Sequence, residues 1–408
     1  MIKPSLGRSV PRHTSDAAIV IVLALALAGA LLWTASAPAR AADWPQFHRD
    51  ASRRGMSPET SLSRRNIDRL RIVWKRATGP SREGINSSPA VADGRVFVGS
   101  DDGRLWAFAA KGGAVLWRRR TGGDVRSSPA VAGNTVYVGS DSGRIFAFAA
   151  RTGHLRWSKR LDVRVTSSPL VVGGRVFVGS RGGTFYALDA DNGRTRWKRN
   201  TWSVWDAPAY RNGTVYVGSD KEMVFAFDAS SGRLRWATHV WGRVRSTPAV
   251  TGNRLFVGTD MGRVYALGLG TGRRVWNVEA IRPGDGFVRY AAAVAGGRVF
   301  VSLGLTTTPM DGKVKAFRAR DGRRLWTAEM ADYSTSSPAY VNGLVIAGSF
   351  DSRLYAFRAG DGREIWTSGW AYQGGFFRRG ISSSPAIAGG RIYIGVRDGR
   401  LYALGLRR

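Results

Sequence analysis

The chain repeats one segment of about forty residues, and this repeat constrains its fold more than any other feature. Eight copies follow Asn86; a typical copy runs through S-S-P-A-V, R-V-F-V-G-S and D-x-G-R, and seven copies end at G-x-x-x-W. The apolar runs alternate in steps of two, as β-strands do. Such a period predicts four-stranded β-propeller blades. The closing tryptophans are Trp117, Trp157, Trp197, Trp236, Trp276, Trp326 and Trp366.

The first copy predicts the strands of a single blade. We expect an inner strand at residues 88–92, two middle strands at 95–100 and 104–109, and an outer strand at 115–119. Gly and Asp gather between these runs because tight turns need positive φ or a side chain that bonds its own backbone. The aspartates of the D-x-G-R turns lack the spacing of a calcium loop, so we interpret them as turn formers.

The last copy supplies three strands between Ser384 and Leu406 and ends without its tryptophan. Residues 70–74, which precede the first copy, end at Trp74 and have the pattern of the missing outer strand. We therefore predict that this N-terminal strand completes the C-terminal blade. Closure removes two open sheet edges and gives an all-β, eight-bladed propeller over residues 70–408, with residues 42–69 as a lead-in.

The first 41 residues have the chemistry of an export signal. Lys3, Arg8 and Arg12 precede an uncharged run at residues 17–39, and two A-x-A-like cleavage sites lie at its end. An uncleaved run of this length could also tether the protein to a membrane. Both readings predict an extracytoplasmic propeller, whether secreted, periplasmic or on the cell surface.

Composition limits the chemistry. The chain has 62 basic and 29 acidic residues, a net charge of +33, which reflects either codon preference or an anionic partner. No motif for sequence-specific nucleic-acid binding is present. The absence of cysteine excludes disulfides, thiolate metal sites, haem attachment and lipidation through cysteine, and the four histidines lie far apart in the sequence.

The spacing A-x-x-x-x-x-G-x-x-x-W, as in Ala107, Gly113 and Trp117, resembles the tryptophan-docking motif of pyrroloquinoline quinone (PQQ) repeat propellers. The lead-in at residues 44–47, followed by Arg53 and Gly55, also resembles the start of bacterial members. The likeness covers residues 44–408 and implies that each tryptophan, Trp74 included, docks against the adjacent blade. Burying one indole contributes roughly 4–6 kcal/mol gross.

Members of this superfamily differ in function. Some are alcohol or sugar dehydrogenases that hold a calcium-bound quinone at the channel mouth beside an aspartate base. Others are non-enzymatic, such as the propeller lipoprotein of the outer-membrane β-barrel assembly machinery. The resemblance alone leaves both functions open.

The fourth and sixth copies depart from the consensus, and their connections are expected to meet at one channel mouth. The candidate rim for a ligand or partner consists of Arg126, Trp202, Trp205, Asp206, Arg245, Arg289, Tyr290, Tyr372 and Arg378. Arginines beside aromatic rings suit an anionic or glycan-like ligand. Alternatively, the rings pack the enlarged loops and the arginines are solvated. Asp206 and Asp285 are the candidate bases, but neither stands in a calcium-binding constellation.

These features together predict an exported, monomeric, non-catalytic scaffold of the cell envelope with no cofactor. Its expected partner is a protein or an anionic envelope polymer. The alternative from another class is a PQQ- and calcium-dependent dehydrogenase, and a third possibility is a module that binds anionic polymers through a basic face.

Overall fold

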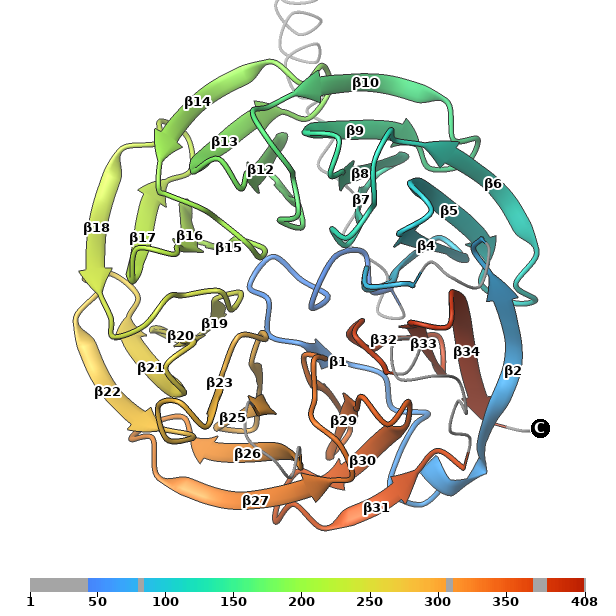
Figure 1. Ribbon diagram of the computed structural model, residues 1–408, viewed down its shortest axis with the longest axis vertical. Helices are drawn as coiled ribbons and strands as arrows, with labels where there is room; N and C mark the ends of the chain where they lie inside the picture. The colour runs from blue at the N-terminus through green and yellow to red at the C-terminus, as the bar shows by residue number, and fades with distance from the viewer. Residues whose placement is uncertain (1–42, 80–83, 306–310, 370–379, 407–408) are drawn as a thin grey trace, which may run out of the picture. The chain divides into compact units, whose positions relative to one another are not determined.

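The computed structural model describes residues 43–79, 84–305, 311–369 and 380–406, all of which belong to one compact unit. Its strands form eight sheets arranged around a common centre, antiparallel except for one short added strand (Figure 1). The prediction of an all-β, eight-bladed propeller is confirmed. The predicted export segment lies outside the described residues. Within those residues no helix is long and apolar enough to cross a membrane.

Blade 1 has the predicted strand order from the centre outward. It consists of β3 (Ala90–Ala92), β4 (Arg95–Ser100), β5 (Arg104–Ala109) and β6 (Val115–Arg120). The inner strand begins two residues later than expected, because Ser88 and Pro89 belong to the connection that enters the blade. Turns with Asp93 and Gly94 in positive φ join the first two strands, as the turn chemistry predicts.

The next four blades repeat this order. Blade 2 contains β7 (Ala130–Ala132), β8 (Thr135–Gly139), β9 (Arg144–Ala149) and β10 (Leu155–Arg160). Blade 3 contains β11 (Leu170–Val172), β12 (Arg175–Gly179), β13 (Thr184–Asp189) and β14 (Thr195–Asn200). Blade 4 contains β15 (Ala209–Arg211), β16 (Thr214–Gly218), β17 (Met223–Asp228) and β18 (Leu234–His239). Blade 5 contains β19 (Ala249–Thr251), β20 (Arg254–Gly258), β21 (Arg263–Gly268) and β22 (Arg274–Glu279).

The remaining blades carry additions. Blade 6 contains β24 (Ala293–Ala295), β25 (Arg298–Leu305), β26 (Gly312–Arg318) and β27 (Arg324–Met330), with β23 (Gly286–Phe287) paired to the end of β25. Blade 7 contains β28 (Ala339–Val341), β29 (Leu344–Gly348), β30 (Leu354–Arg358) and β31 (Glu364–Thr367), with β1 (Met56–Ser57) added parallel to β28. Blade 8 contains β32 (Ala386–Ala388), β33 (Arg391–Val396) and β34 (Arg400–Leu406).

The N-terminal strand closes the ring as predicted. β2 (Leu70–Ala77) pairs antiparallel with β34 and becomes the outer strand of blade 8. Trp74 lies opposite Ala403, the register that Trp117 and Ala107 have in blade 1. The short 3-10 helix η1 (Ile67–Arg69) leads directly into β2.

The closing tryptophans join neighbouring blades through one repeated contact. The Trp117 ring packs on Gly153 of the next blade, where an added Cβ would lie 2.7 Å from the indole, and its Nε1 donates to the carbonyl of Ala150 at 3.0 Å. Gly153 also has a φ of +71°, so the position needs glycine for two reasons. The same hydrogen bond to the next blade is made by Trp74, Trp157, Trp197, Trp236, Trp276 and Trp326. Trp366 is half-buried and packs against the apolar cluster at the closure seam.

The paired serines of the S-S-P motif have separate structural roles. The first serine bonds within its own blade, as Ser127 does with the amide of Gly139 at 2.8 Å. The second serine bonds the blade before it, since the Ser128 hydroxyl accepts from the amide of Ser88 at 3.0 Å. The motif therefore links strands in two directions close to the centre of the ring.

We expect Trp197→Ala to lower the free energy of unfolding by about 3–5 kcal/mol, because it leaves a cavity at a blade interface. Exposed Leu234 provides the control, since Leu234→Ala should change it by less than about 0.5 kcal/mol. Chemical denaturation of both variants measures the difference. Equal stability of Trp197→Ala and the wild type would refute the role of interblade docking.

Candidate interaction site

Residues 44–57, which we call the central segment, cross the middle of the ring (Figure 1). Trp44 exchanges two backbone hydrogen bonds of 2.8 Å with Val91 of blade 1. Carbonyl groups farther along the segment accept amide hydrogens from Val131, Tyr210, Val250, Val294 and Tyr340, one residue from each of five other inner strands, at 2.7–2.8 Å.

Side chains of the central segment reach the two blades that remain. The Gln46 side chain accepts from the amide of Val171 in blade 3 at 3.3 Å, and the Ser57 hydroxyl donates to the carbonyl of Ile387 in blade 8 at 3.1 Å. Every blade is therefore bonded to this one segment. Sequence reasoning identified Trp44, Arg53 and Gly55 only as a family-like lead-in and did not predict that the lead-in occupies the centre.

Arg53 anchors the central segment from within. Its side chain is fully buried, and it donates to the carbonyl groups of Pro208 at 3.0 Å, Pro169 at 2.9 Å and Phe47. Burial lowers the pKa of Arg53 to about 10, so the guanidinium remains charged at neutral pH. The bonds to Pro169 and Pro208 connect the segment to the residues that immediately precede the inner strands of blades 3 and 4.

The unusual sequence of copies four and six accommodates this segment. Phe47 packs against Ala207 and Ala291, which stand where most other copies have the second serine of the motif. A smaller side chain at these two positions leaves room for the phenylalanine ring. The alanines at these two positions therefore have a packing cause.

Asp206 and Tyr290 replace the first serine of the motif in the same two copies. The Asp206 carboxylate accepts from the amide of Ala207 at 2.8 Å, and burial raises its pKa to about 6 while Arg53 opposes this shift. Burial also raises the pKa of Tyr290, on which Asp206 acts as a further charge. Both side chains are half-buried beside the central segment.

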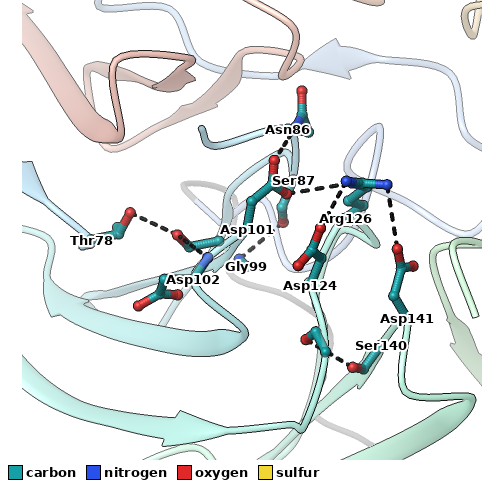
Figure 2. A network of polar contacts seen from close by, with 12 residues as sticks. Thr78, Asn86, Ser87, Gly99, Asp101, Asp102, Asp124, Arg126, Ser140 and Asp141 are labelled. Carbon is teal, nitrogen blue, oxygen red and sulfur yellow. Dashed lines mark hydrogen bonds and ion pairs between the residues drawn. The ribbon is translucent and has the colours of Figure 1, made fainter. Parts of the chain in front are cut away.

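The face that carries the connections between blades is called the entry face. Here the second-to-third strand turns bond the connections, as the amide of Asp141 does with the carbonyl of Asp124 at 2.9 Å. Figure 2 shows Arg126 among three carboxylates of this face. Its guanidinium lies 2.7 Å from Asp124, 3.3 Å from Asp141 and 3.6 Å from Asp101. Arg126 thus bridges the turns of blades 1 and 2.

A second cluster on the entry face combines arginines with an indole ring. Arg181 and Arg245 lie over the ring of Trp205 at 3.2 and 4.4 Å from its centroid. Asp220 completes the cluster, accepting from Trp205 Nε1 at 2.6 Å and from Arg245 Nε at 2.8 Å. The predicted pair Trp205 and Arg245 is therefore assembled, and cation–π and ionic contacts hold both side chains in place.

The other rim candidates are more dispersed. Arg289 lies over Phe287 at 4.1 Å and 3.9 Å from Asp260, while burial and the nearby charge of Arg245 lower its pKa. Asp285 lies in the connection that leads into blade 6. Tyr372 and Arg378 lie outside the described residues.

Two tryptophans project from adjacent connections on the entry face. Trp202, between blades 3 and 4, is 46% exposed, and Trp241, between blades 4 and 5, is 44% exposed. Trp202 was among the predicted residues, whereas Trp241 was missed. A signal was available in the sequence, since Trp241 follows Trp202 by 39 residues and so takes the same place in the next copy.

The described residues do not fit a calcium-bound quinone at the centre. Calcium takes six to eight oxygen ligands, whereas no group of three or more potential metal-ligating His, Cys, Asp or Glu side chains occurs in this part of the chain. The group beside Asp206 is instead the cationic Arg53, and Phe47 fills the space next to it. Two interblade clefts of about 430 and 560 Å³ lie elsewhere, lined by Arg95 and Arg151 and by Arg254 and Arg318.

The fold and the docking tryptophans define a quinoprotein-like β-propeller of PQQ-type repeats. Within that class, the chain belongs to the family described as outer membrane protein assembly factor BamB, which matches residues 19–138, 113–208 and 199–407. BamB of Francisella tularensis is 36% identical over 56 residues, which span 13% of this chain and only 12% of that relative's length.

Solved structures share the fold at low sequence identity. BamB of Moraxella catarrhalis superposes with a TM-score of 0.69 and 20% identity, over 83% of this chain and 98% of that one. The quinohemoprotein alcohol dehydrogenase of Pseudomonas putida HK5 gives a TM-score of 0.76 and 16% identity, over 90% and 80% of the two chains. At such identities the likeness establishes the fold alone.

We expect Arg53→Ala to lower the free energy of unfolding by at least about 3 kcal/mol, because three buried carbonyl groups lose a charged donor. The adjacent Arg54 makes a partly exposed ion pair with Asp50, so Arg54→Ala should cost less than about 1 kcal/mol. Denaturant titration of both variants tests this. Equal losses would show that the central segment does not depend on Arg53.

Asp206 should make the fold less stable as the pH rises. Its pKa is raised to about 6 in the folded chain, from about 3.9 when unfolded. A raised carboxyl pKa adds stability that is complete below pH ~4 and is lost as the pH passes ~6. From pH 4 to 7 the wild type should therefore lose about 2 kcal/mol relative to Asp206→Asn. A constant difference between the two proteins across this range would contradict the assignment.

Proposed function

We propose that this protein is a non-catalytic scaffold of the cell envelope that docks a protein partner on its entry face, over blades 3 to 5. The observation that carries the proposal is the pair of exposed tryptophans, Trp202 and Trp241, on neighbouring connections. Tryptophan and arginine are enriched among the residues that dominate protein interfaces. The clustered Arg181, Trp205 and Arg245 beside them supply a rigid border with polar groups.

The backbone at Trp202 supports a role beyond folding. Trp202 has a φ of +58°, a conformation that costs a bulky residue free energy. An earlier copy has Gly122 at this place, with a φ of +79°. The Trp202 ring stacks on Phe225, with 6.4 Å between the ring centroids, yet 46% of the residue remains exposed. An exposed tryptophan where glycine would be less strained supports a contact made outside the chain.

Family membership and the predicted export segment support the proposed location in the cell envelope and the proposed class of partner. The family description names an outer membrane protein assembly factor, which suggests a protein partner engaged in envelope assembly. Export, attachment through residues 17–39 and a monomeric state belong to the same proposal. The dehydrogenase alternative is less well supported, because Asp206 bonds its own backbone neighbour and faces Arg53 rather than a metal-ligating group.

The test replaces Trp202 or Trp241 with a photoreactive phenylalanine analogue in cells that express the chain. We expect both positions to cross-link one protein partner. Matched control positions are Leu234 and Val275, equally exposed on outer strands. Trp202→Gly should abolish the cross-link formed through position 241 while leaving the unfolding free energy within about 1 kcal/mol of the wild type.

Two outcomes would contradict the scaffold proposal. One is equal labelling at the tryptophan and control positions, which would remove the preference for the entry face. The other is saturable, dye-linked oxidation of an alcohol or sugar on addition of PQQ and calcium, with turnover abolished by Asp206→Asn. The second result would favour the enzyme.

A further inference from the structure

The outer strands of the blades form the side wall of the ring, and basic residues are unequally distributed along it. Four strands that follow one another around the ring, β2, β6, β10 and β14, each carry three Lys or Arg and no Asp or Glu (Figure 1). These residues are Arg71, Lys75, Arg76, Arg118, Arg119, Arg120, Arg156, Lys159, Arg160, Arg196, Lys198 and Arg199.

The outer strands of the other four blades differ sharply. β18, β22 and β27 carry one arginine each, and β31 carries none. Three of these four strands also contain a glutamate: Glu279, Glu329 and Glu364. A preference for arginine codons would act on all eight copies alike. It therefore does not account for a wall that is basic over half of the blades only.

Part of the basic set maintains the fold. Arg76, Arg119 and Arg199 donate through Nε to the carbonyl groups of a glycine in the next blade at 2.7–3.0 Å. Four others, Lys75, Arg120, Arg160 and Lys198, are exposed, and among the described residues none of them has an ion-pair partner within 4.0 Å. These four side chains represent all four basic strands.

We propose that the wall formed by β2, β6, β10 and β14, which we call the basic wall, binds an extended, phosphate-rich polyanion. Guanidinium groups form paired hydrogen bonds with phosphate, and closely spaced cations add their attraction along a linear ligand. A flexible polymer can follow strands that turn around a ring, whereas a flat bilayer can contact few of them together.

Apolar contacts do not distinguish the two halves of the wall. Ile72, Val115 and Leu155 are exposed on the basic half, and Leu234, Val275 and Leu325 are similarly exposed on the other. Charge is thus the property that differs, which favours a polyanion over a ligand recognised by its apolar groups. This inference does not rest on the proposed function, because the basic wall and the entry-face tryptophans are separate surfaces.

The test uses end-labelled linear inorganic polyphosphate and the full chain, with binding followed by fluorescence anisotropy across a salt titration. The variant Lys75→Gln, Arg120→Gln, Arg160→Gln and Lys198→Gln should bind at least about tenfold more weakly at low salt. Its plot of log affinity against log salt should also become shallower, by roughly 0.7 for each phosphate that the variant no longer neutralises. The unfolding free energy of this variant should equal that of the wild type, so that a weaker affinity reports the lost charges and not lost structure.

The control variant removes the same charge from the other side of the ring: Arg233→Gln, Arg273→Gln, Arg274→Gln and Arg324→Gln, all exposed positions. It should retain affinity within about twofold. Equal losses in the two variants would overturn the proposal and leave only attraction to the total charge. It would also fail if the protein bound phosphatidylglycerol vesicles through these residues while ignoring the polymer.

Discussion

The backbone hydrogen bonds of the central segment are the constraint on which this propeller depends. A four-stranded blade buries its faces only against its neighbours, so the ring must hold together as a whole. Val131, Tyr210, Val250, Val294 and Tyr340 each donate an amide hydrogen to the segment, so blades far apart in sequence share one bonding partner. Arg53 holds the segment in place through hydrogen bonds to the carbonyl groups of Pro208 and Pro169.

Two further kinds of junction act outside this centre. Near it, second serines such as Ser128 accept amide hydrogens from the preceding blade, and at the periphery Trp117 and its equivalents dock on a glycine of the following one. The serine junction is interrupted where Ala207 and Ala291 make room for Phe47. At these two blades, hydrogen bonds to the central segment take the place of the serine hydroxyl that the Phe47 ring displaces.

The sequence predicted the parts of the fold that leave a repeated side-chain pattern. The alternation of apolar residues predicted the strands. Trp74 predicted the closure of the ring, because its docking contact needs an indole at a fixed register. The central segment was not predictable in this way, since it bonds mainly through its own carbonyl groups and carries no repeat. For Asp206 and Tyr290 the sequence left both a ligand rim and internal packing open, because a departure from consensus looks alike whether a ligand or the chain itself fills the space. The spacing of Trp202 and Trp241 was a usable signal, but it follows the regular period and does not stand out among departures from the consensus.

Function in this account is carried by surfaces that the inner packing leaves free. Trp202 and Trp241 mark the entry face, and the basic wall marks one side of the ring.

The central claim, that the segment bonds the blades together, is tested most directly by hydrogen exchange at the amides of Val131, Tyr210, Val250, Val294 and Tyr340 in the intact protein. We expect these five amides to exchange as slowly as amides within β4 and β5, because they open only with the ring. Fast exchange at these five amides beside protected strands would contradict it.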